Sequence, residues 1–369
     1  SLRRMSWKRK LGNDWGRLDM RFNLWEDCNR VPLTELLSFI VDNRGKTVPT
    51  APSGHKLIAT NCVTNNALFP VYEKIRYLSE ETYQTWFRAH PIPGDILFVN
   101  KGTPGRVCLV PDPVDFCIAQ DMIALRADES KIYPKYLFAV LRSREIQQQI
   151  YNTNVGDVIP HFKKQFLDQL LIPIPERSIQ ESIGDLYYVL SLKAERNKKI
   201  NDNLYAQAKA IFDNHFINID AIPAGWRKGN LLDIANYLNG LAMQKFRPQG
   251  HEIGLPVLKI KELRQGSCDD SSELCSLSIK PEYIIHNGDV VFSWSGSLLV
   301  DIWCGGTCGL NQHLFKVTSD VYDKWFYYLW TAHHLARFIA IAADKATTMG
   351  HIKREELAKA EVLIPCEED

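Results

Sequence analysis

The sequence predicts an α+β protein: two tandem homologous domains of mixed helix and strand, related by a pseudo-two-fold and separated by a long coiled-coil-type helix. Three observations support this fold class. A series of motifs occurs twice in the same order, each half alternates strand-like and helix-like apolar patterns, and one long heptad stretch lies between the halves. The length of 369 residues agrees with two cores, because domains usually hold roughly 100–200 residues.

The repetition is anchored by a Gly-Asp motif. Residues 94–98 read Gly-Asp-Ile-Leu-Phe, and residues 288–292 read Gly-Asp-Val-Val-Phe, 194 positions later. A recurring series of this kind indicates a duplicated domain. Further pairs follow at offsets between 189 and 200: Gly45 with Gly240, Ile58 with Leu258, Gln120 with Gln312, Tyr133 with Tyr322, His161 with His351, and residues 171–173 with 363–365. We therefore assign the chain as a basic N-terminal segment (1–30), a first domain (31–175), a heptad helix (176–220), a second domain (221–365) and a short tail (366–369).

Each copy shows the same order of local patterns. An amphipathic segment predicts a short opening helix, with its C-cap at Gly45 in the first copy and at Gly240 in the second. Apolar runs and Gly-Asp turns predict strands, and a helix-spaced apolar run follows the last strand. The expected strands lie at 56–58, 96–99 and near Gln120 in the first copy and at 256–260, 290–292 and near Gln312 in the second, and the expected helices at 136–141 and 325–330.

Between the copies, apolar residues recur at spacings of four and three, which predicts one helix over residues 178–216, about 57 Å long at 1.5 Å per residue. Such a stripe must pack against another surface. We expect a partner protein there, although a helix lying across the domain surfaces is the alternative. The stripe consists of Ile179, Ile183, Leu186, Leu190, Ile200, Leu204 and Ile211, and the polar residues Lys193, Asn197 and Gln207 occupy the remaining positions of the same helix face.

Composition indicates a folded protein, with 45% hydrophobic and 24% charged residues. The net charge of +1 neither requires nor excludes a nucleic-acid partner. The first 17 residues carry six Lys or Arg against one Asp, which fits a phosphate-contacting arm or a solvated tail. No apolar run has the length of a membrane span or a signal peptide, so a cytoplasmic location is expected, and the nine scattered cysteines are expected to be reduced.

Motifs for catalysis and metal binding are missing from the sequence. No Asn/Asp-Pro-Pro-aromatic tetrapeptide of an amino-methyltransferase and no phosphate-binding loop with Gly-Lys-Ser/Thr occurs. Cys304, Cys308 and His313 lack a fourth ligand for a structural zinc site, and the acidic residues near Asp115 lack a suitably spaced lysine for a nuclease. The sequence therefore predicts a protein without a catalytic site, a metal site or a bound cofactor.

Two Gly-Asp-aliphatic-aliphatic-Phe domains, each closing with a His followed by Ile-Pro, around a heptad helix that starts Ile-Gln-Glu-Ser-Ile at residue 179, resemble the specificity subunit of type I restriction-modification systems. The resemblance covers about residues 31–365. It implies a DNA-binding protein whose two target-recognition domains each read one half of a bipartite duplex target. It also implies a helix that docks methyltransferase (modification) subunits and, through them, restriction/translocase subunits, with S-adenosylmethionine, ATP and Mg bound by those partners only.

The chain departs from the family pattern in one respect. A second long helix normally follows the second recognition domain and pairs antiparallel with the first, but this chain ends at residues 366–369. We expect either a truncation or a helix supplied by another chain, which would favour self-association through the unpaired helix.

Base readout requires side chains on loops that reach the major groove, supported by cations on phosphates. Equivalent loops are polar and basic in both copies, with residues 101–103 standing where 294–296 stand, so the two half-sites are expected to differ. His161 and His351 fit a structural or a DNA-contacting role equally. The DNA-contacting candidates are Arg44, Lys46, Lys56, Asn61, Lys101, Thr103, Arg106, Lys163 and Lys164 in the first copy, and Gln244, Lys245, Arg247, Lys259, Lys261, Ser293, Trp294, Ser295, Lys353 and Arg354 in the second.

Two other functions stay open at this point. The chain fits the recognition component of a combined restriction-methylation enzyme whose catalytic part is encoded elsewhere. It also fits a twin-domain adaptor that binds proteins instead of DNA, and a weak salt dependence of duplex binding would favour that reading.

Overall fold

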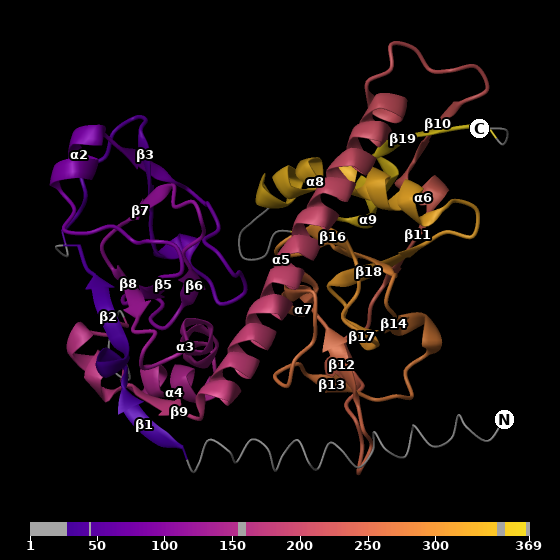
Figure 1. Cartoon of the computed structure of the whole chain (residues 1–369). Helices are drawn as coiled ribbons and strands as arrows, with labels where there is room; N and C mark the ends of the chain where they lie inside the picture. The colour runs from indigo at the N-terminus through magenta and orange to yellow at the C-terminus, as the bar shows by residue number, and fades with distance from the viewer. Residues whose placement is uncertain (1–27, 44–45, 154–159, 345–350, 367–369) are drawn as a thin grey trace, which may run out of the picture. The chain divides into compact units, whose positions relative to one another are not determined.

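The computed structural model describes residues 28–43, 46–153, 160–344 and 351–366 (Figure 1). Contacts divide the chain into two units, residues 1–202 and 203–369, and each is described by itself. The division falls inside the long helix, so the domain limits at 31, 175, 221 and 365 stay predictions. Most of the basic N-terminal segment and of the tail lies outside the described residues.

Unit 1 contains three small sheets. Their strand orders are β2-β8-β5-β6, β4-β3-β7 and β1-β9, and only the β3–β7 pair is parallel among the described pairings of this unit. The strands are β1 (Asn29–Pro32), β2 (Leu37–Val41), β3 (His55–Ile58), β4 (Arg76–Leu78), β5 (Ile96–Val99), β6 (Val107–Leu109), β7 (Phe116–Ile118), β8 (Met122–Ala127) and β9 (Leu171–Ile174); the helices are η2 (Leu33–Leu36), η3 (Thr60–Cys62), α2 (Glu80–Thr85), α3 (Pro134–Leu141), α4 (Arg144–Thr153) and η4 (Lys164–Gln169).

Unit 2 repeats this arrangement. Its strand orders are β11-β18-β15-β16, β13-β12-β17-β14 and β10-β19, and β12 again runs parallel to β17. The two tandem mixed domains of the sequence prediction are therefore confirmed as a fold class. The strands are β10 (Arg227–Asn230), β11 (Asn236–Asn239), β12 (Leu255–Leu258), β13 (Leu274–Cys275), β14 (Ile284–Ile285), β15 (Val290–Ser293), β16 (Leu299–Ile302), β17 (Cys308–Leu310), β18 (Leu314–Thr318) and β19 (Glu361–Ile364); the helices are α6 (Leu231–Ile234), η6 (Met243–Lys245), α7 (Ile260–Gln265), η7 (Pro281–Tyr283), α8 (Lys324–Asp344) and α9 (Arg354–Ala358).

The repeated Gly-Asp motif forms the same turn in both units. Gly94 and Gly288 have φ of 86° and 91°, a conformation that glycine adopts without strain. The Asp95 side chain accepts a hydrogen bond of 3.0 Å from the amide of Ile92, and Asp289 accepts one of 2.8 Å from the amide three residues before it. The motif recurs because the glycine makes the turn and the aspartate closes it.

The long helix α5 (Arg177–Phe212) continues as a π-helical turn (Asp213–Ile217), which confirms the predicted helix (Figure 1). In unit 1 its side chains Ile183, Tyr187 and Leu192 pack against the core that includes α3. Gly184 permits this approach, because a Cβ there would lie 2.6 Å from a backbone nitrogen of α3. Further along, Phe212 belongs to the core of unit 2.

The predicted opening helices are shorter than expected. In unit 1 the segment forms one turn, η2, and then becomes strand β2, and in unit 2 α6 is followed by β11. Ladder pairing with β8 and β18, together with aromatic and β-branched residues, outweighs the helical spacing there. Gly240 is therefore no helix cap: it follows β11, and a Cβ there would lie 2.2 Å from the carbonyl oxygen of Asn311. Gly45 lies outside the described residues.

In the part of the chain that the structure describes, no helix combines the length and the apolar character needed to span a bilayer.

Candidate nucleic-acid interface

A loop junction forms at the equivalent place in each unit, where the chain leaving the Gly-Asp strand meets two other segments. We define the unit 1 junction as residues 100–103, 120–121 and 160–163. Lys101 forms an antiparallel bridge with His161, and the amide of Phe162 donates a hydrogen bond of 2.7 Å to the carbonyl of Asn100. The recurrent histidine of the sequence is thus placed beside the loop that the sequence singled out.

The unit 2 junction consists of residues 294–297, 311–313 and 351–353. Ser295 forms the antiparallel bridge with His351, and the amide of Ile352 donates a hydrogen bond of 3.0 Å to the carbonyl of Trp294. The same backbone contacts therefore hold both junctions.

These contacts correct the register expected from the sequence. Because Phe162 and Ile352 bind the carbonyls of Asn100 and Trp294, those two residues are equivalent, and Lys101 is equivalent to Ser295. The expectation that Lys101 stands where Trp294 stands is wrong by one residue.

The unit 1 junction combines charged and amide side chains. Asn100 is 6% exposed, and its backbone N–H donates to the carbonyl of Asp121 at 2.8 Å. Asp121 has φ of 73°, a left-handed conformation that turns the chain sharply between β7 and β8. The outer side chains are half-buried Lys101 and exposed Asp121.

The other unit 1 candidates near this junction differ in what they contact. Thr103 is half-buried in the turn, whereas Arg106 and Lys163 are exposed. Lys164 forms an ion pair with Asp42, and burial lowers the pKa of Lys164 below its usual value.

The unit 2 junction is aromatic. The Trp294 ring centroid lies 6.0 Å from that of His313 and 6.2 Å from that of His351, and its Nε1 donates to Oδ1 of Asn239 at 2.9 Å. The Ser295 hydroxyl lies 3.0 Å from Nδ1 of His313. This half of the molecule therefore presents rings where unit 1 presents an amide and charges.

Of three further unit 2 candidates, two serve local structure and the third is an exposed cation. Ser293 is fully buried and donates to the carbonyls of Ser295 and Ser297 at 3.2 and 3.1 Å, so in this conformation it holds the turn and has no atom available to a ligand. Arg354 donates to the carbonyl of Tyr237 at 2.9 Å, and exposed Lys353 lies 3.6 Å from Glu355.

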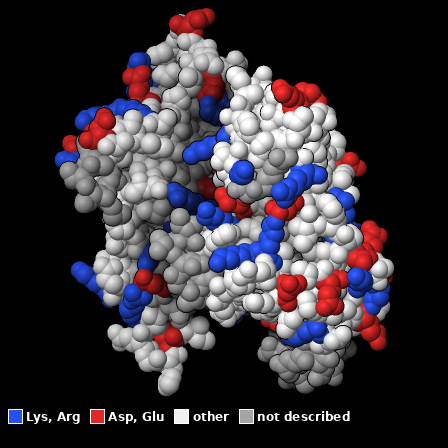
Figure 2. Space-filling view, turned by 90° about the vertical axis from the view of Figure 1, so that its left-hand side faces the viewer, with Lys and Arg blue, Asp and Glu red and all other residues white. Residues whose placement is uncertain are grey.

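Acidic partners neutralise several predicted cations away from the junctions. Glu273 pairs with both Arg247, at 2.7 Å, and Lys259. Lys56 pairs with Asp115. Sequence reasoning missed these pairs because the partners are brought together only by the fold, and Figure 2 accordingly shows basic and acidic side chains interleaved on the face in view.

The remaining DNA-contacting candidates are either hydrogen-bonded within the protein or exposed. The Asn61 side chain donates to the carbonyl of Glu73 at 2.6 Å, and Lys261 donates to the Ser271 hydroxyl at 2.8 Å. Arg44 lies outside the described residues, whereas Lys46, Gln244 and Lys245 are exposed.

The predicted stripe of α5 divides into a packed part and an open part. Ile179 and Ile183 are half-buried on unit 1, while Leu186, Leu190, Ile200, Leu204 and Ile211 are between 55% and 63% exposed. Val189 and Tyr205 add to this open face. The heptad pattern found the open face but missed Tyr187, Tyr188 and Leu192, which make the packing contacts.

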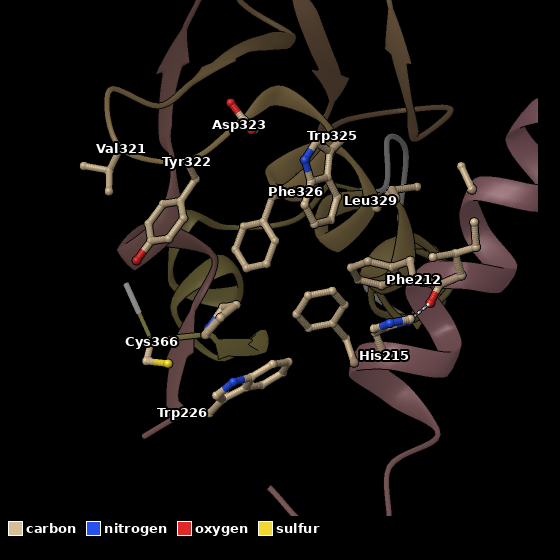
Figure 3. Close-up of a pocket in the computed structure, with 14 residues that line it drawn as sticks. Phe212, His215, Trp226, Val321, Tyr322, Asp323, Trp325, Phe326, Leu329 and Cys366 are labelled. Carbon is tan, nitrogen blue, oxygen red and sulfur yellow. Dashed lines mark hydrogen bonds between the residues drawn. The ribbon is translucent and has the colours of Figure 1, made fainter. Parts of the chain in front are cut away.

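An apolar groove of about 1020 Å³ lies within unit 2 at the end of α5 (Figure 3). Its rings come from the end of α5, the π-helical turn, the segment before β10 and the start of α8, and include Phe212, Trp226 and Trp325. Ile211 lines the groove and also ends the open stripe, and its carbonyl lies 3.0 Å from Nδ1 of His215. The groove therefore continues the apolar surface of the helix.

Metal ligands do not gather in the described ranges, where no three His, Cys, Asp or Glu side chains are placed to hold an ion. Cys304 is exposed and Cys308 is buried, and burial raises the pKa of the Cys308 thiol.

Comparison with known proteins finds relatives that share these features. A model of the type I restriction modification DNA specificity domain matches residues 38–206. The type I restriction enzyme MjaIX specificity subunit of Methanocaldococcus jannaschii is 21% identical over 297 residues, which are 74% of this chain and 67% of the relative. The HindI specificity subunit of Haemophilus influenzae is 26% identical over 136 residues, 36% of this chain and 29% of the relative.

The fold has a solved counterpart. The S subunit of a type I restriction-modification system from M. genitalium superimposes with a TM-score of 0.53 at 14% identity, over 92% of this chain and 85% of that one. The matched residues and the duplicated fold lead to one assignment: residues 38–206 match the type I restriction modification DNA specificity domain, and the chain as a whole is similar to specificity subunits of type I restriction-modification systems.

Proposed function

We propose that this chain is a non-catalytic DNA-specificity subunit in which each unit reads one half of a bipartite duplex target. It acts in the cytoplasm with methyltransferase subunits and, through them, with restriction/translocase subunits, and S-adenosylmethionine, ATP and Mg are bound by those partners. The observation that carries the proposal is the pair of loop junctions, which share their backbone hydrogen bonds and differ in their side chains.

A shared backbone with different side chains is what a split, asymmetric target requires. Base edges in the major groove are distinguished by their donors and acceptors, so an amide and a lysine read different bases from those that a tryptophan and a histidine read. Exposed cations beside the junctions, such as Lys163 and Lys353, supply phosphate contacts that position the protein without specifying sequence.

The open stripe of α5 supports the docking role. Five large apolar side chains lie on one exposed helix face, and their exposure to water is unfavourable. The groove at Ile211 extends this apolar surface. We assign this surface to the methyltransferase subunits. Self-association through the same stripe is the competing arrangement, because the helix of a second chain would cover the same side chains.

Selection from a randomised duplex library tests the proposal, with this chain purified together with its methyltransferase subunits. The expected result is two specified half-sites separated by a spacer of fixed length and unspecified sequence. Enrichment of one continuous motif, or of no motif, overturns it. A Leu204→Asp variant serves as the control for docking: it is expected to lose the methyltransferase subunits in gel filtration while its thermal unfolding is unchanged, because Leu204 is exposed.

A further inference from the structure

Two side-chain amide oxygens in the unit 1 junction are buried without a hydrogen-bond donor among the described residues. They are Oδ1 of Asn100 and Oε1 of Gln120. Buried acceptors of this kind cost stability and are rare in folded proteins, so they point to a partner that arrives from outside the chain.

Unit 2 shows how the same glutamine is satisfied internally. The amides of Ala119 and Asn311 donate to the carbonyls of the equivalent residues Ile58 and Leu258, at 2.9 and 3.2 Å, which makes Gln120 and Gln312 equivalent. In unit 2, Nδ2 of Asn311 donates to Oε1 of Gln312 at 2.9 Å.

In unit 1 this donor is lost. Ala119 occupies the place of Asn311, and a methyl group has no hydrogen bond to give. The difference between the two glutamines is therefore chemical and does not come from the backbone, which is held alike in both units.

The surroundings of Gln120 suit a base-reading role. Lys101 and Asn100 both donate their backbone amides to the carbonyl of Asp121, at 3.3 and 2.8 Å, which fixes the chain directly after Gln120. Asn100 also donates from Nδ2 to the carbonyl of Phe162 at 3.3 Å, so it ties the segments of the junction together. Gln120 itself is only half-buried, so its side chain can turn outward by rotation about its own bonds.

We propose that Gln120 is a specificity-determining residue of unit 1, whose amide pairs with a base in its half-site, and that Asn100 is a positioning residue. This rests on the proposed function. An amide accepts from the exocyclic amino group of adenine and donates to N7 beside it, so adenine is the base expected. Gln312, held by Asn311, does not read a base in this way.

Library selection with the purified complex tests this inference. Gln120→Ala is expected to reduce the preference for adenine at one position of one half-site by about tenfold or more, with the other half-site unchanged. Gln120→Glu is expected to move the preference at that position to cytosine, because a carboxylate accepts from the cytosine amino group. The matched control Gln312→Ala is expected to leave both half-sites as they are.

A second variant tests the base preference while Gln120 is still present, and because Ala119 is 1% exposed, its thermal unfolding is compared with that of the wild type. Ala119→Asn restores the internal donor of unit 2, and it is expected to weaken the same base preference while Gln120 is still present. If the wild type selects a bipartite target and the Gln120 variants select the same one, Gln120 binds an ordered water only and the inference is overturned. If the wild type selects no bipartite target, the proposed function fails first.

Discussion

Asp95 and Arg126 are joined by two charge-assisted hydrogen bonds, Nε to Oδ1 at 2.9 Å and Nη2 to Oδ2 at 3.0 Å. The Asp95 side chain is 1% exposed. In unit 2 the equivalent Asp289 receives Lys316 at 2.9 Å, and its side chain is 23% exposed. The turn aspartate of each unit is thus neutralised by a cation from the neighbouring strand, although the two cations occupy different register positions.

Asp95→Ala is expected to lower the free energy of unfolding by about 2–3 kcal/mol, because it leaves Arg126 unpaired beside a buried turn and removes the acceptor for the amide of Ile92. Chemical denaturation of the purified protein measures this loss.

Asp289→Ala is the matched control. Its carboxylate is 23% exposed, against 1% for Asp95, so a smaller loss of about 1 kcal/mol is expected. Equal losses in the two variants would show that burial does not set the strength of these pairs.

Glu273→Gln is expected to tighten DNA binding roughly threefold to tenfold, because it releases Arg247 and Lys259 from a shared carboxylate. Each cation that then binds a phosphate adds about 0.9 to the slope of log K against log salt. Fluorescence anisotropy across a salt series measures both quantities.

Exposed Glu282 provides the control for that variant, since Glu282→Gln makes the same change of net charge away from these cations. The salt slope is expected to stay at the wild-type value. A Glu273→Gln protein with an unchanged slope would remove Arg247 and Lys259 from the phosphate-contacting set.

The free energy of unfolding is expected to fall as the pH drops through the range in which two packed histidines, His333 and His334, become protonated. Burial lowers the pKa of His334 to about 4, from an ordinary value of 6.5, and lowers the pKa of His333 as well. The unfolded chain therefore binds more protons than the folded chain in this range, so the stabilising effect is complete above pH 6.5 and is lost progressively toward pH 4. Thermal unfolding at a series of pH values measures the loss.

His334→Gln separates this effect from other titrations. Nε2 of His334 donates to the carbonyl of Glu361 at 2.8 Å, and a glutamine amide can donate there without titrating. The variant is expected to show a shallower dependence between pH 6.5 and 4. A dependence as steep as that of the wild type would assign the effect to other groups.

Deletion of residues 193–199 removes one heptad from α5 and keeps the stripe in register. The helix shortens by about 10.5 Å, so the recognised spacer is expected to lose about three base pairs while both half-sites persist. Methylation sequencing measures the spacer. Lys198→Ala, on the exposed surface of the same segment, is expected to leave it unchanged; an unchanged spacer after the deletion would show that α5 does not set the separation.

The duplication was predictable because its anchors perform backbone tasks that few residues can perform. Gly94 adopts a positive φ, and the Asp95 side chain accepts the hydrogen bond that closes the turn. The pair therefore recurs in the sequence as a recognisable motif. The long helix was predictable from its heptads. Gly240 was misread because its task, close approach to Asn311, depends on a segment far along the chain.

The candidate site was predictable only as a region. The loops after the Gly-Asp strands and the two histidines are placed together, and the offset of 194 between the two Gly-Asp motifs already pairs Lys101 with Ser295, so the one-residue register error at Lys101 was avoidable. Ser293 looked like a polar loop residue and is the buried end of β15. The pairing of Glu273 with Arg247 and Lys259 likewise arises from the fold and not from sequence spacing.

The most direct test of the central claim is an exchange of one loop, with residues 99–107 replaced by the equivalent residues 293–300, followed by sequencing of methylated bases in a host that carries the gene with its methyltransferase. A bipartite motif is expected in the wild type and, after the exchange, a change confined to one half of that motif. A change in both halves, or in neither, would contradict separate readout by the two units.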